Sequence, residues 1–169
     1  MRSLRRFVLT ALIAPAAIAV SMVASPAEAA PASTQARTAQ AATAQTLRAD
    51  ITRLTNAQRT ANGCPAARVN AQLGSAAAGH SAWMARTGTF SHTGSAGSTF
   101  ITRARAAGFT RPAGENIAWG YRSATEVVTG WMNSPGHRAN ILNCRSTTVG
   151  VGVAFNASGN PYYTQVFGY

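Results

Sequence analysis

The C-terminal stretch of the chain limits the fold most, because its apolar residues alternate with small ones. Large apolar side chains occupy every second position from Val149 to Phe155, and glycine or alanine stands between them. This alternation predicts a strand over 147–155 with one buried face. Turn-forming residues follow at 156–161, and a second apolar run at 162–169 predicts a strand that pairs with the first as a hairpin.

The segments before this hairpin have the apolar spacing of helices. Asn62 and Gly63 end the first of these segments in the way that glycine commonly ends a helix. Because the helices come first and the hairpin last, the fold class predicted is α+β, with a small antiparallel sheet covered by helices. Helices are predicted at 46–61, 70–87 and 98–107 (the last packing through Phe100, Ile101 and Ala104), followed by a short strand at 114–121 and two helices within 123–142.

The stretch 123–142 contains a predicted break between two short helices. Apolar residues follow helical spacing in its first half. Pro135 cannot continue that helix, and Ser134 before it is typical of the N-cap of a new one. An unbroken helix would hold Glu126 and His137 roughly 16 Å apart, at about 1.5 Å per residue. Only a turn at this break brings the two side chains toward one site.

One histidine falls on the apolar stripe of the second predicted helix. Leu73, Ala77, His80 and Met84 share this stripe at helical spacing. A buried imidazole needs a hydrogen-bond partner, so a hydrogen-bonded core histidine is the favoured reading. A ligand role for His80 is the other reading.

Residues 1–29 are predicted to be a secretory signal peptide. Arginines precede an apolar run, and Ala27-Glu28-Ala29 fits the small-x-small rule, so cleavage is expected after Ala29. An uncleaved membrane anchor is the alternative. The stretch 30–45, rich in Ala, Thr and Gln, is predicted to be a disordered or frayed linker. The remainder, 46–169, is the predicted folded domain of a secreted protein, with no transmembrane segment after cleavage.

The charge of the chain is strongly positive. All 15 basic residues are arginine, only 4 residues are acidic, and the formal net charge is +11. Such a charge predicts weak adhesion to anionic cell-envelope polymers. The arginines are scattered rather than gathered in a basic run, so specific nucleic-acid recognition is not expected.

Cys64 and Cys144 are the 2 cysteines of the sequence. An even pair in an exported protein predicts one disulfide. In the chain-entropy account, a loop of about 80 residues closed in this way contributes about 4 kcal/mol. Two buried free thiols, or a site in which cysteine and histidine share a metal, are the alternatives.

Four side chains are the candidates for polar chemistry, and the two histidines among them lie in predicted loop or cap positions. They are His92 and His137, with Glu115 and Glu126 as the carboxylates beyond the first predicted helix. Two neutral imidazoles with a carboxylate and water can bind zinc. A buried hydrogen-bond network of glutamate and histidine explains the same residues equally well. A Ser91–His92 nucleophile is disfavoured, because adjacent side chains point in different directions.

Four phrases of the sequence resemble the bacterial branch of the CAP superfamily, which includes cysteine-rich secretory proteins, antigen 5 and plant pathogenesis-related proteins. They are FSHTG (90–94), GENIAWG (114–120), EVVTGWMNSPGHRANIL (126–142) and YYTQVFG (162–168), in the order of the family. The resemblance covers about 47–169 and implies an α-β-α sandwich. The chain lacks the extra cysteine-rich domain of eukaryotic relatives, and sterol binding is not implied.

The resemblance also implies a pocket of two histidines and two glutamates. By motif, these are His92, Glu115, Glu126 and His137, with His92 and His137 able to hold a divalent ion, expected to be zinc. Supporting polar groups around the pocket are expected from Ser91, Asn116 and Ser134.

Two functions follow from this resemblance. The favoured one is an extracellular binding module of unknown ligand, because no single reaction is common to the family. The alternative is a metal-dependent, peptidase-like hydrolase in which Glu115 or Glu126 serves as general base toward a metal-bound water.

Overall fold

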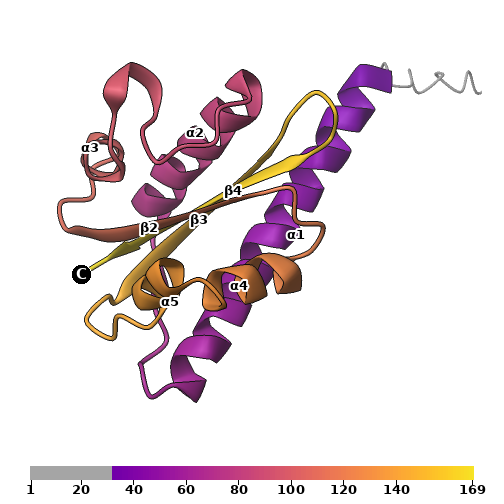
Figure 1. Ribbon diagram of the computed structural model, residues 1–169. Coiled ribbons are helices and arrows are strands. Elements are labelled where there is room, and N and C mark those ends of the chain that lie inside the picture. The colour runs from indigo at the N-terminus through magenta and orange to yellow at the C-terminus, as the bar shows by residue number, and fades with distance from the viewer. Residues whose placement is uncertain (1–31) are drawn as a thin grey trace, which may run out of the picture. The chain divides into compact units, whose positions relative to one another are not determined.

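A computed structural model describes residues 32–169, which form a four-stranded sheet with helices on both faces (Figure 1). The predicted signal peptide lies outside the described residues. The elements are α1 (Ala32–Ala61), β1 (Arg68–Val69), α2 (Ala71–Thr87), a 3₁₀ turn (Ser95–Gly97), α3 (Phe100–Ala106), β2 (Pro112–Trp119), α4 (Ala124–Met132), α5 (Pro135–Ile141), β3 (Thr148–Phe155) and β4 (Pro161–Gly168).

The sheet has the strand order β1-β3-β4-β2. The predicted hairpin is confirmed, because β3 and β4 pair antiparallel, and β2 pairs antiparallel with the other side of β4. The strand β1 pairs parallel with β3 through Arg68 and Val69, so the sheet is mixed rather than purely antiparallel. A strand of two residues has no alternation to detect, which is why the sequence did not predict it.

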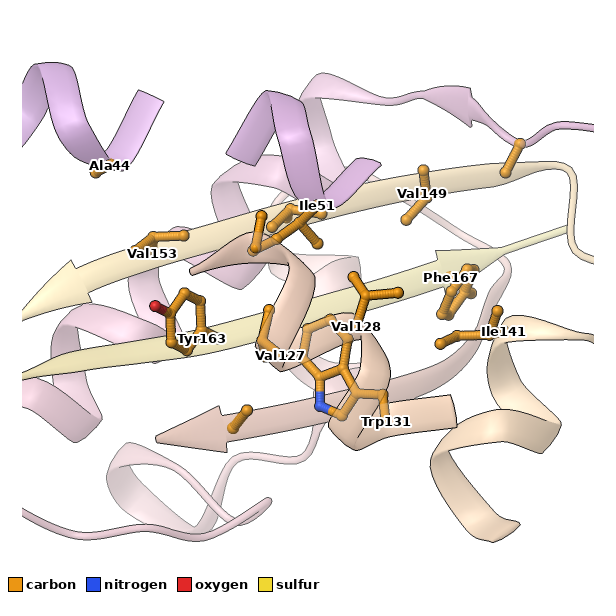
Figure 2. Packing of buried hydrophobic residues seen from close by; sticks show 14 residues of the cluster. Ala44, Ile51, Val127, Val128, Trp131, Ile141, Val149, Val153, Tyr163 and Phe167 are labelled. Carbon is orange, nitrogen blue, oxygen red and sulfur yellow. The ribbon is translucent and has the colours of Figure 1, made fainter. Parts of the chain in front are cut away.

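The larger hydrophobic core lies on the sheet face that α1, α4 and α5 cover. Figure 2 shows Ile51 of α1 over β3, between Val149 and Val153, and Trp131 of α4 toward β2, with Val128 beside it. The opposite face is covered by α2 and α3, through a cluster that includes Leu73 and Ala104. Helices therefore cover both faces of the sheet, and the predicted α+β class is confirmed.

Glycines in β3 let α2 approach the sheet closely. A methyl group added to Gly150 would fall on the backbone of Leu73 and Gly74, and one added to Gly152 would fall on the backbone of Ala77. The valines that alternate with these glycines point to the opposite face. The alternation in the sequence therefore places the large side chains of β3 on the face that α1 covers. Glycine and alanine lie on the face that α2 covers.

The first helix begins at Ala32 rather than near Thr46, so residues 32–45 of the predicted linker are helical. Alanine has the best intrinsic helix propensity, and this stretch is rich in it. Ala44 is buried in the larger core cluster and anchors part of this extension. The prediction of disorder was wrong here because it weighed the lack of large apolar residues above helix propensity.

The third helix is shorter than predicted and packs through fewer residues. Thr99 caps it in a capping box with Thr102, and it ends at Ala106. Ala104 is fully buried, whereas Ile101 is exposed, so the packing role predicted for Ile101 was wrong.

The predicted break between α4 and α5 is confirmed. Ser134 is the N-cap of α5, and Pro135 takes the first helical position. The chain turns at this point, and His137 lies in the first turn of the new helix.

The ends of α1 and α5 are joined by a disulfide and by a buried arginine. Cys64 and Cys144 form the predicted disulfide. The guanidinium of Arg59 is fully buried, and burial lowers the pKa of Arg59 from its usual value. Its partners are backbone carbonyls rather than acids: it donates to Pro65, Ile141, Asn143 and Ser146.

A membrane-crossing helix is not found within residues 32–169, because no helix there is both long and apolar enough.

The close approach of α2 to the sheet predicts opposite effects for two Gly→Ala substitutions. Gly152→Ala is expected to lower the free energy of unfolding by about 3 kcal/mol, because the methyl group has to displace helix backbone. Gly79 lies within α2, where an added methyl group meets nothing. Gly79→Ala is expected to raise the free energy of unfolding by up to about 1 kcal/mol. Urea denaturation measures both variants. Equal stability of the two would contradict this packing.

Candidate functional site

A buried carboxylate forms the centre of the candidate site. Glu115 lies in the middle of β2, and only 1% of its side chain is exposed. His92 Nδ1 donates to its Oε1 at 2.9 Å, and Arg103 Nη2 donates to its Oε2 at 2.6 Å. Both oxygens are therefore occupied, and the ion pair with Arg103 compensates the buried charge.

The same arginine fastens the loop that carries His92. Arg103 Nη2 donates to the carbonyl of His92 at 3.1 Å, and Nη1 donates to the carbonyl of Ser98 at 2.7 Å. Arg103 of α3 thus binds the loop at two points, the carbonyl of His92 and the carbonyl of Ser98. Because Nδ1 of His92 is bound to Glu115, its Nε2 is the nitrogen left for a ligand, on a side chain that is 55% exposed.

His80 of α2 binds the loop that carries His92. It is fully buried in α2, and its Nε2 donates to the carbonyl of Ser91 at 2.9 Å. The carbonyl can only accept, so Nδ1 carries no proton in the neutral ring, and Nδ1 is buried without a partner among the described residues. Burial is the main cause that lowers the pKa of His80, and Glu115 opposes it. The predicted core role of His80 is confirmed.

His137 is the second histidine of the candidate site. It is half-buried in the first turn of α5. Burial lowers its pKa, and the positive charge of His92 lowers the pKa of His137 further. Its imidazole is therefore neutral near pH 7, the form that coordinates metal ions.

A network of buried amides positions the backbone around His137. Asn116 is fully buried, and its Nδ2 donates to the carbonyl of His137 at 3.2 Å. Asn140 donates to the carbonyl of Glu115 at 3.1 Å and to Asn116 Oδ1 at 2.9 Å. Asn116 also donates to Gln165 of β4. Asn116 thus joins the backbone of α5 to Gln165 of β4 from the strand that carries Glu115.

Glu126 lies apart from this cluster. Its Oε2 accepts from the backbone N–H of Arg122 at 2.8 Å, and its own N–H donates to Ser123 Oγ, the N-cap of α4. Its charge acts on Tyr163, where burial first and Glu126 second raise the pKa of the phenol to about 12. The carboxylate of Glu126 therefore binds the backbone just before α4, and the structure shows no contact between it and His92, Glu115 or His137.

The other supporting residues differ in their roles. Ser91 Oγ accepts from the N–H of Thr93 at 3.0 Å and shapes the loop, while its carbonyl binds His80. Ser134 makes no side-chain cap to α5 and lines a groove beside His137.

This groove has a volume of about 290 Å³ and aromatic walls. Phe90 and Trp119 are each 52% exposed, and Tyr121 is 36% exposed. Trp131 forms its floor, with Nε1 donating to the carbonyl of Ile117. Exposed aromatic rings beside a hollow are typical of a recognition surface. The groove opens next to His137.

Sequence reasoning missed Arg103, Asn140 and the exposed aromatic residues. The contacts of Arg103 and Asn140 join segments far apart in the chain, which no local pattern reveals. The N-cap of α4 did have a signal, because a serine before a helical apolar pattern is typical of an N-cap, and Ser123 accepts from the N–H of Glu126.

The side chains of the site suit a metal ion with few protein ligands. Among residues 32–169, no group of three or more His, Cys, Asp or Glu side chains is arranged to hold a metal ion. His92 is oriented by a carboxylate, as metal-ligating histidines commonly are, and its charge lowers the pKa of His137. These residues fit an ion that takes two protein ligands and completes its shell with water.

The buried ion pair predicts different effects for two neighbouring arginines. Arg103→Gln is expected to lower the free energy of unfolding by about 3 kcal/mol, because Glu115 loses the cation that compensates its buried charge. Arg105→Gln on the same helix is exposed and is expected to change it by less than about 0.5 kcal/mol. Chemical denaturation at neutral pH measures both. An equal loss in the two variants would show that the ion pair is not responsible.

The lowered pKa of His80 predicts a loss of stability in mild acid. The unfolded chain binds a proton at His80 near pH 6.5, and the folded chain binds it only at lower pH, so stability is lost as pH falls below about 6.5. His80→Gln keeps a donor toward Ser91 but does not titrate. Denaturation at pH 7.5 and pH 5.5 is therefore expected to show a smaller pH effect in the variant than in the parent. The same pH effect in both would rule out this role.

Two proteins of Bacillus subtilis are similar to this chain in sequence. YkwD of Bacillus subtilis, named as an uncharacterized protein, is 36% identical over 118 residues, which cover 69% of this chain and 45% of YkwD. YlbC, named as an uncharacterized membrane protein of the same species, is also 36% identical over 118 residues, covering 69% of this chain and 33% of YlbC. The chain thus spans less than half the length of these relatives.

A solved structure agrees with the sequence relatives. An extracellular protein of Bacillus anthracis that contains an SCP domain matches with a TM-score of 0.68 and 32% identity, covering 74% of this chain and 41% of that one. An outer surface protein of Borrelia burgdorferi matches with a TM-score of 0.63 at 19% identity, covering 69% of this chain and 87% of that one, and so shows the shared fold alone. The profile of the cysteine-rich secretory protein family, CAP, matches residues 52–167. The chain therefore belongs to the CAP family of cysteine-rich secretory proteins.

Proposed function

We propose that this protein is a secreted binding module whose aromatic groove, together with a divalent ion held by His92 and His137, engages an extracellular ligand. The observation that carries the proposal is the bond from His92 Nδ1 to Glu115, which leaves Nε2 for a ligand on a half-exposed side chain. The electrostatic effect of His92 on the pKa of His137 supports pairing these two imidazoles. When bound, the ion supplies a Lewis-acidic contact for oxygen or nitrogen atoms of the ligand.

The rigidity of the site supports binding. The loop of His92 is held by Arg103 from α3 and by His80 from α2. The turn of His137 is held by Asn116. Because these supports are buried, the groove keeps its shape without a ligand, and little ordering entropy is lost on binding. Phe90 and Trp119 offer rigid, half-exposed rings for contact.

Export to an oxidising compartment is supported by two further observations. Residues 1–29 have the sequence of a signal peptide, and the disulfide of Cys64 and Cys144 is typical of exported proteins. A similar solved structure comes from a protein described as extracellular. The net charge of +11 supports weak adhesion to anionic polymers of the cell envelope as a second mode of contact.

The hydrolase alternative has less support from the site. A general base needs a carboxylate oxygen that is free to take a proton. Both oxygens of Glu115 are occupied by His92 and Arg103, and Oε2 of Glu126 accepts from the backbone N–H of Arg122. Glu115 orients His92 in this arrangement.

Zinc binding tests the proposal. The parent protein is expected to bind one zinc ion per chain, and His92→Ala and His137→Ala are each expected to weaken binding by at least about tenfold, because each removes one of two protein ligands. Phe90→Ala removes a wall of the groove but neither imidazole, and is expected to bind zinc like the parent. Isothermal titration measures affinity, and elemental analysis of protein purified without chelator gives the metal content.

The pH dependence of zinc binding provides a second readout of the same site. Protons compete for the imidazole nitrogens, so the affinity is expected to fall as pH drops below about 6.5. Affinity unchanged between pH 8 and pH 5 would contradict ligation by histidine. Turnover of a peptide, ester or glycan substrate that tracks the metal content would replace the binding module with the hydrolase.

A further inference from the structure

One edge of the sheet is covered over only part of its length. The outer strand β1 pairs with Thr148 and Val149, whereas β3 continues to Phe155. From Val151 onward, β3 has β4 on one side and no strand on the other within residues 32–169. Figure 2 shows β1 beside the Val149 end of β3, with no strand beside the end that carries Val153.

The peptide groups of Val151 and Val153 face this open side. The N–H of Asn70 donates to the carbonyl of Val149, so the peptide group of Val149 points toward β1. In a strand paired antiparallel, alternate residues point their N–H and C=O groups to opposite sides. Val151 and Val153 share the direction of Val149 and point away from β4. Such a row of peptide groups is a template for an added strand.

A groove gives an added strand access to this edge. It has a volume of about 490 Å³ and runs between α1 and the sheet edge, with Thr52 on one wall and Val151 on the other. Val69, the last residue of β1, lies at the groove and is 74% exposed. The groove therefore begins where β1 ends, and it shares no residue with the groove beside His137.

The charges around this groove favour an acidic occupant. Arg48 and Arg53 both line it. Asp50 is the acid on this part of α1, and it pairs with Arg53 at 3.1 Å on the exposed surface. Arg48 donates to Gln45 and has no acid partner among the described residues. A second copy of this chain would bring two more arginines and a net charge of +11, so charge disfavours self-association here.

We infer that an extended acidic segment of another protein adds to the sheet along Val151–Phe155, with its carboxylates against Arg48 and Arg53. Backbone hydrogen bonds to Val151 and Val153 supply the pairing, and the two arginines select the charge. The added strand continues the line of β1, and this surface is a second binding site beyond the one proposed at His92 and His137.

A synthetic peptide tests this inference. The probe alternates Thr and Glu over about ten residues, the upper length of common strands, and its counterpart alternates Thr and Lys. The Thr–Glu peptide is expected to bind the protein and to slow hydrogen exchange at the amides of Val151 and Val153. The Thr–Lys peptide is expected not to bind. Fluorescence anisotropy measures affinity, and exchange followed by NMR locates the contact.

Charge-reversal variants separate this site from general attraction between a basic protein and an acidic peptide. Arg48→Glu and Arg53→Glu are each expected to weaken binding at least about fivefold, and Arg48→Gln by less, because reversal replaces attraction by repulsion. Arg37→Glu, also exposed on α1 but outside the groove, makes the same change of net charge and is the matched control.

Several results would overturn the inference. They are equal weakening by Arg37→Glu, slowed exchange at amides other than those of the open edge, equal binding of the Thr–Lys peptide, and absence of binding. A dimer that forms through this edge in sedimentation would assign the surface to a second copy instead.

Discussion

The buried carboxylate of Glu115 is the constraint on which the candidate site depends. A charge that is almost fully removed from water destabilises a fold unless a cation and hydrogen bonds compensate it. Arg103 supplies the cation from α3, and His92 supplies the second hydrogen bond from a loop. The compensation therefore determines where the loop lies and which nitrogen of His92 is left for a ligand.

The packing of α2 on the sheet provides the second support. Gly150 and Gly152 let the helix approach closely, which brings His80 beneath the loop and its Nε2 to the carbonyl of Ser91. The site is thus assembled from a sheet strand, three helices and a loop, none of which holds it alone. His137 lines a groove with aromatic walls, and the open edge of β3 offers a second surface of different chemistry.

Features that depend on neighbouring residues could be predicted from the sequence. The alternation in β3, the helical stripe that contains His80 and the break at Pro135 were each predicted and confirmed. Features that depend on contacts between residues far apart in the chain could not be predicted from the sequence. The pairing of Arg103 with Glu115 joins segments that no local pattern relates, and β1 is too short to have a pattern.

One error had another cause. The helicity of residues 32–45 was missed although alanine favours a helix, because the segment lacks large apolar residues. The grouping of Glu126 with the two histidines rests on family resemblance and stays a prediction, and its carboxylate binds the backbone N–H of Arg122 in this structure. A residue can keep its place in a family motif while its local hydrogen bonds give it a structural role.

The tautomers of the histidines test the central claim most directly. A long-range ¹H–¹⁵N NMR spectrum at alkaline pH, assigned with His92→Ala and His80→Gln proteins, shows which ring nitrogen carries the proton. The hydrogen bonds predict opposite tautomers: the proton on Nδ1 in His92, bound to Glu115, and on Nε2 in His80, bound to Ser91. A proton on Nε2 of His92 would contradict the account, because the nitrogen left for a ligand would then be the one that faces Glu115.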